Sequence, residues 1–108
     1  MTQFDVHRNP GGSRDTVPFV VIVQSSRFDG VPTRLAAPLI ELPQGSPLRA
    51  PPHLPRFLVL GRALVLDMLQ LQSIPRRALG LAIASLADDD SAMRIVSALD
   101  EVTSRAHG

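Results

Sequence analysis

Short apolar stretches separated by turn residues run through the first part of the chain and predict β-structure there. Phe4 and Val6 alternate with polar neighbours, which is the two-residue period of a half-buried strand. Residues 17–25 (VPFVVIVQS) are rich in β-branched side chains and apolar on both faces, as in a central strand. The NPGG sequence at 9–12 separates the two stretches with residues that suit turns.

The β pattern resumes after the turn signal Asp29-Gly30 and continues through residues 33–42. Pro38 lies within this stretch and favours an edge strand or a bulge, because proline lacks the N–H that a sheet ladder requires. Five prolines between residues 43 and 55 then predict a long surface loop, since regular ladder pairing is improbable there.

Residues 56–60 and 63–68 predict two strands joined as a hairpin at Gly61-Arg62. Ile74-Pro75 begins an irregular segment, and the type of residues 81–86 stays open. The first half of the chain therefore reads as mainly β.

The clearest helix begins after three acidic residues. Asp88, Asp89 and Asp90 supply an N-cap and favourable negative charge at the positive end of a helix. The apolar residues that follow at three- and four-residue spacings predict one buried stripe, made of Ala92, Ile95, Val96, Leu99 and Val102.

Composition predicts a single domain, 1–108, with a core thin enough to favour an oligomer. The 11 basic residues are all arginine and lie scattered, the net charge is +1, and the aromatic residues are four Phe. A nucleic-acid-binding face usually clusters basic and aromatic side chains, so this composition argues against one. No signal peptide and no apolar run of about 20 residues is present, so we expect a cytoplasmic domain outside the membrane.

Residue types with catalytic or metal-binding chemistry do not form a recognisable motif. The chain has no cysteine, and His7, His53 and His107 show no metal-ligand spacing. The acidic triplet at 88–90 is explained by helix capping rather than by a metal. No GxSxG turn surrounds Ser25 or Ser26, and the glycines match no phosphate-binding loop. These observations predict a non-enzymatic binding domain without a metal or cofactor.

Four segments resemble the CcdB family of toxins from bacterial toxin–antitoxin modules. They are QFDVHRNPGGSR at 3–14, VPFVVIVQSSRFDGVPTRLAAPL at 17–39, IPRRALGLAIASL at 74–86 and SALD at 97–100. The most specific signal is VQS followed by an aspartate and a T-R-x-x-x-P-L stretch. The resemblance implies a homodimer of mainly β fold: an SH3-like barrel of antiparallel strands with a small β wing and one C-terminal α-helix.

The same resemblance implies the toxin component of a type II toxin–antitoxin module. Such a toxin binds the A subunit of DNA gyrase, traps the enzyme with cleaved DNA, and is neutralised by a cognate, CcdA-like antitoxin. It is not an enzyme and carries no cofactor, and no direct sequence-specific DNA binding is expected.

Two groups of site residues carry over by resemblance. The segment after VQS, with Arg27, Phe28 and Asp29, and the helical Asp100 fall on the antitoxin-binding positions. Phe28 also reads as a core or dimer residue, and Asp29 as a residue that closes a turn with Gly30. The gyrase-binding positions at the chain end fall on Thr103, Ser104, Arg105 and Ala106, where the family carries an aromatic residue followed by Trp-Gly-Ile.

Two alternatives stay open at this point. One is a gyrase-inactive CcdB-like module that retains antitoxin binding. The other is an endoribonuclease toxin of the MazF type, which shares the SH3-like barrel; His7 or Asp5 would then serve as a base and the arginines would bind RNA phosphates.

Overall fold

The computed structural model describes residues 2–12, 15–42 and 51–104. The strands in these ranges are β1 (Asp5–Arg8), β2 (Phe19–Ile22), β3 (Thr33–Glu41), β4 (Arg56–Val59), β5 (Arg62–Leu66), β6 (Gln72–Pro75) and β7 (Ala84–Ser85). The helices are α1 (Asp89–Thr103) and three short 3-10 turns, η1 (Ser26–Phe28), η2 (Met68–Gln70) and η3 (Arg76–Ala78). The predicted proline-rich loop lies largely outside the described residues.

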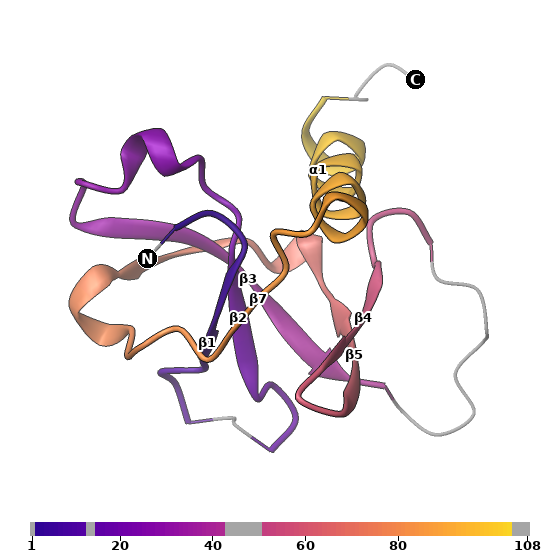
Figure 1. Ribbon diagram of the computed structural model, residues 1–108, viewed down its shortest axis with the longest axis horizontal. Coiled ribbons are helices and arrows are strands. Elements are labelled where there is room, and N and C mark those ends of the chain that lie inside the picture. Colours follow the sequence, from indigo (N-terminus) through magenta and orange to yellow (C-terminus); the bar gives the residue numbers. More distant parts are fainter. Residues whose placement is uncertain (1, 13–14, 43–50, 105–108) are drawn as a thin grey trace.

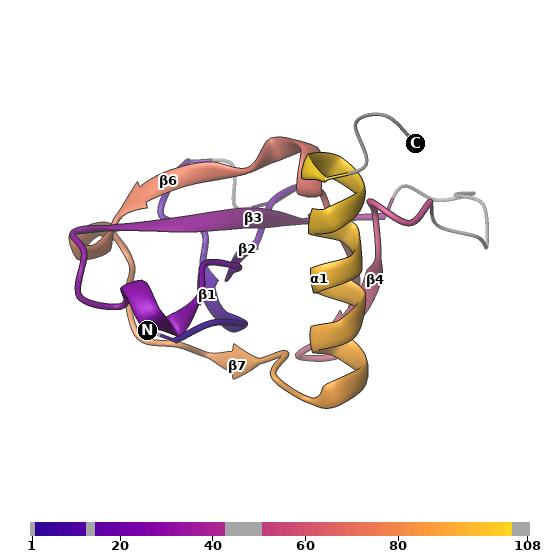
Figure 2. The same ribbon diagram turned by 90° about the horizontal axis from the view of Figure 1, so that it is seen from above.

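All strand pairs are antiparallel, in the order β4-β5-β3-β2-β1-β7, with β6 also paired to β3. The sheet curls into a nearly closed barrel, and α1 stands beside it against the β4–β5 hairpin (Figure 1). Seen from above, β6 and β7 lie on opposite sides of the barrel (Figure 2). The hairpin and the end of β3 form the small wing. The predicted mainly β barrel with one C-terminal helix is confirmed.

Pro38 lies in the middle of the sheet, so the predicted edge position is wrong. It is buried and opposes Val20 of β2. Its carbonyl accepts a hydrogen bond from the Asp67 N–H (3.0 Å), on the side away from β2. There the partner of β3 changes from β6 to β5, so the N–H that proline lacks would face a gap between two ladders. The proline thus removes no ladder bond.

The wing hairpin turns one residue earlier than predicted. Its two central residues are Leu60 and Gly61, with φ of 50° and 79°, and Val59 opposes Arg62. A two-residue turn of this kind requires positive φ at both central positions. Gly61 adopts positive φ in the second position without strain. Leu60, which carries a side chain, adopts it in the first position.

Two other local predictions differ from the structure. Phe4 has φ of 70° and precedes β1, which begins at Asp5, although its N–H still bonds the Ile22 carbonyl (2.6 Å). The segment predicted as irregular, from residue 74 on, contains the end of β6 and the two-residue strand β7, separated by η3. Both strands are short and irregularly spaced, so neither shows an alternating pattern in the sequence.

Most of the core lies between the sheet and α1. Its members are the buried side chains Val6, Phe19, Val21, Val23, Ala37, Leu39, Phe57, Val59, Leu64, Leu66, Met68, Leu86, Ile95 and Ala98. Of the predicted helix stripe, Ile95, Leu99 and Val102 face this core. Val96 does not, because its side chain is 52% exposed. Three- and four-residue spacings place Val96 at the border of the stripe, and the helix turns its inward face toward Ile95 and Ala98 instead.

Candidate partner-binding site

Residues 25–29 form one tight turn rather than an open loop. The Ser25 hydroxyl accepts a hydrogen bond from the Arg27 N–H (3.3 Å) and caps η1. The Asp29 N–H donates to the Ser26 carbonyl (3.1 Å) and closes it. Ser25 follows the apolar strand β2, so the sequence VQSS takes the chain directly from the core to the surface.

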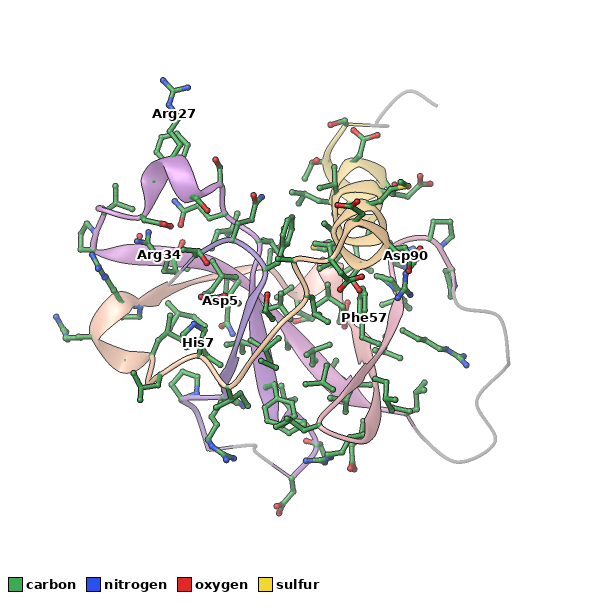
Figure 3. All side chains as sticks on the ribbon, in the orientation of Figure 1. Asp5, His7, Arg27, Arg34, Phe57 and Asp90 are labelled. Atoms are coloured by element: carbon green, nitrogen blue, oxygen red, sulfur yellow. The ribbon has the colours of Figure 1, made fainter. Side chains whose placement is uncertain are left out.

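The η1 turn presents an aromatic and a cationic side chain to solvent. Phe28 is 48% exposed, and the Arg27 guanidinium lies 5.9 Å from the centroid of its ring. Figure 3 shows Arg27 pointing away from the barrel at the end of this turn. The reading of Phe28 as a core residue is therefore wrong within the single chain, because half of the side chain is open to solvent.

Arg34 on β3 lies beneath the turn and is fully buried (Figure 3). Its Nη1 donates to the carbonyl of Phe28 (2.6 Å) and to that of Thr33 (3.2 Å). Its Nη2 lies 3.9 Å from Oδ1 of Asp29, which makes an ion pair. Asp29 thus both closes η1 and faces the buried guanidinium.

The end of α1 carries polar residues that hydrogen-bond to carbonyls of the preceding helical turn. The Thr103 hydroxyl donates to the Leu99 carbonyl (2.7 Å), and the Ser104 N–H donates to the Asp100 carbonyl (2.8 Å). Both Thr103 and Ser104 are exposed. The other two predicted gyrase-binding residues, Arg105 and Ala106, lie outside the described residues.

Asp100 is not brought together with the η1 residues within one chain. It is half-buried on α1, and α1 and η1 lie on separate sides of the molecule in both views (Figures 1 and 2). The predicted antitoxin-binding set is therefore split between two surfaces.

Sequence reasoning missed the role of Arg34 and the outer face of α1. Arg34 is the arginine of the T-R-x-x-x-P-L stretch, but its burial follows from the path of η1 over β3. Met93 and Ser97 line a groove of about 320 Å³ between α1 and residues Pro51, Pro52, Pro55 and Arg56. The sequence signal for this groove is the four-residue spacing of Met93 and Ser97, which places both on one face of the helix.

Among the described residues, no three His, Cys, Asp or Glu side chains lie close enough together to bind a metal ion. His7 is 1% exposed and its Nδ1 lies 2.9 Å from the Gly80 carbonyl, so it cannot reach an RNA substrate as a base. Asp88 caps α1 as predicted, and its pKa is lowered because its carboxylate accepts a hydrogen bond from the Ser91 N–H (3.0 Å).

The described residues form a small β-barrel flanked by one helix, with Phe28 of the η1 turn exposed at its surface. The chain matches the protein family described as CcdB protein over residues 3–104, and it belongs to that family. The family consists of non-enzymatic toxins of toxin–antitoxin modules. No curated protein sequence matches the chain significantly. In the described part of the chain, no helix is long and apolar enough to span a membrane.

Proposed function

We propose that this chain is a homodimeric, cytoplasmic toxin that targets the A subunit of DNA gyrase, and that a CcdA-like antitoxin neutralises it at η1. The antitoxin site is supported by the half-exposed Phe28, which lies on a turn whose backbone is hydrogen-bonded to the buried Arg34. A large aromatic side chain held in place at a surface is the usual anchor of a protein interface. Arg27 adds a cation beside it, which suits an acidic partner segment.

We place Asp100 in the same antitoxin site because a long antitoxin segment would reach both α1 and η1. Because α1 and η1 lie apart, one compact contact does not span them. An antitoxin segment that binds in an extended form covers such a distance and buries a long surface. A homodimer would offer each antitoxin a second copy of both surfaces.

The gyrase surface is proposed at the end of α1, on Thr103 to Ala106. Thr103 and Ser104 supply hydroxyl groups in place of an aromatic anchor, and the Thr103 hydroxyl is already bonded to the helix backbone. That observation favours a second candidate function, a CcdB-family binding module without gyrase activity that retains the antitoxin. The two functions share η1 and differ only in the target.

Growth of a bacterial host tests the proposal. Expression of the native chain is expected to stop growth, and co-expression of a CcdA-like antitoxin is expected to restore growth. Phe28→Ala should weaken antitoxin binding at least about 30-fold, the loss typical of an interface anchor. The matched control is Leu81→Ala, which removes an 89% exposed leucine outside η1. Equal antitoxin binding by native chain and Phe28→Ala would contradict the η1 site.

A further inference from the structure

Arg34 is a fully buried charged side chain on the longest strand of the barrel. Removing a guanidinium from water is unfavourable unless its N–H groups find partners. An apolar side chain of similar volume at such a position is commonly neutral or stabilising. The stability of the barrel alone therefore does not call for arginine at this position.

Arg34 contacts η1 and the residues beside it. Nη1 donates to the carbonyl of Phe28, and Nη2 pairs with Asp29, while Nε and Nη2 find no hydrogen-bond partner among the described residues. The Phe28 carbonyl also accepts from the Val31 N–H (3.1 Å). Two donors thus converge on the backbone oxygen of the residue whose side chain is exposed.

We propose that Arg34 is a positioning residue for partner binding: it fixes the backbone of Phe28 and Asp29 so that the Phe28 ring is held ready at the surface. This inference rests on the proposed function, because η1 is the partner-binding turn in both. A binding segment that is already ordered loses less conformational entropy when it binds. Arg34 is itself fully buried and touches no partner, so its effect on affinity passes through η1.

Amide hydrogen exchange of the full chain tests the positioning directly. The variants are Arg34→Met, which keeps the volume and removes the charge, and Arg34→Lys, which keeps the charge and one donor. The readout is the exchange of the Phe28, Asp29 and Val31 amides, which are bonded to Ser25, Ser26 and Phe28 carbonyls. The control is Arg62→Met, which removes a half-exposed arginine of β5 that is paired with Glu41.

Arg34→Met is expected to speed exchange of these three amides about tenfold or more, the effect of losing a hydrogen bond to a charged donor. Amides of the β2–β3 ladder should exchange as in the native chain, Arg34→Lys should restore part of the protection, and Arg62→Met should change none of it. Unchanged exchange in η1 would overturn the proposal. Equal acceleration throughout the barrel, or failure of Arg34→Met to fold, would assign Arg34 to the barrel and also overturn it.

Binding to a CcdA-like antitoxin separates this inference from the proposed function. If the native chain binds, Arg34→Met should weaken binding about as much as Phe28→Ala, and full affinity of Arg34→Met would overturn the proposal. If the native chain does not bind, the antitoxin assignment of η1 fails, and the exchange measurement alone still decides whether Arg34 positions η1.

Discussion

The guanidinium of Arg94 lies over the ring of Phe57, 4.3 Å from its centroid, and joins α1 to the wing. Its Nη1 also donates to the carbonyl of Arg56 (2.6 Å), and its Nε pairs with Asp90 one helical turn earlier (3.2 Å). Figure 3 shows Phe57 beneath the start of α1, near Asp90. Within the described residues β4 is the end strand of the sheet path, and Arg94 bonds a backbone carbonyl of that strand.

Arg94→Ala is expected to lower the free energy of unfolding by about 1–3 kcal/mol, since it removes a cation–π contact and a charged hydrogen bond together. The measurement is urea unfolding of the native chain and the variant. Asp90→Ala is the control: it removes an exposed ion pair on the helix and one negative charge of the first helical turn, and it should change stability by about 1 kcal/mol or less. Equal losses in both variants would show that the contact with the wing contributes nothing.

The turn of the wing predicts two opposite effects on stability. Gly61→Ala places a Cβ at φ of 79° and should destabilise the chain by about 1–2 kcal/mol through backbone strain alone, because no atom lies within 4 Å of that Cβ. Leu60→Asn should stabilise it by about 1 kcal/mol, since asparagine tolerates the left-handed region and suits this turn.

Thermal or urea unfolding checks both substitutions. Gly30→Ala is the matched control, because Gly30 has no positive φ and equally open surroundings. It should leave stability unchanged or slightly raised. A neutral Gly61→Ala would contradict the assigned turn.

The N-cap of α1 predicts a pH dependence of stability. The pKa of Asp88 lies below its ordinary value of 3.8 because its carboxylate accepts a hydrogen bond from the Ser91 N–H. A lowered folded-state pKa means that the ionised form is favoured by folding, so its contribution is fully present above pH 3.8 and is lost as the pH falls through the lowered value.

Comparison with Asp88→Asn isolates this charge, since asparagine also caps helices. Urea unfolding of both proteins between pH 7 and pH 2 should show a stability difference in favour of aspartate near neutrality. That difference should shrink as the pH falls below 3.8. A difference that stays constant over this range would exclude the ionised cap as its source.

The helix α1 and the strand β3 show which structural features the sequence predicts and which it does not. The acidic cap and the apolar spacing located the helix correctly, because both signals act within one or two turns of the chain. Spacing alone predicts Val96 in the buried stripe, because it does not fix the width of the stripe, yet Val96 is 52% exposed. The sequence around Pro38 favours an edge or a bulge, because the change of partner along β3 depends on strands more than 20 residues away.

The candidate site is likewise predictable from the sequence only in part. The VQS segment pointed to η1, and the exposure of Phe28 agrees with a surface role. The part played by Arg34 depends on a strand and a turn packing together, which single-residue patterns do not encode. The endoribonuclease alternative names His7 as a base, yet His7 is buried and its ring lies against the Gly80 carbonyl.

Adjacent residues of α1 test the corrected helix face. Ile95→Ala should lower the free energy of unfolding by about 2–5 kcal/mol, because its side chain is 1% exposed and its removal leaves a cavity. Val96→Ala should change it by about 0.5 kcal/mol or less, as for a surface substitution. Losses of similar size would restore Val96 to the core.

Trapping of cleaved DNA by gyrase tests whether this chain acts on the gyrase A subunit. Purified native chain is incubated with gyrase and supercoiled plasmid, beside a variant carrying Thr103→Phe, Ser104→Trp, Arg105→Gly and Ala106→Ile and ending there. We expect linear DNA to accumulate with the native chain and at least as strongly with the variant. No linear DNA with the native chain, together with accumulation in the variant, would contradict a gyrase target and leave a CcdB-family module that binds only its antitoxin.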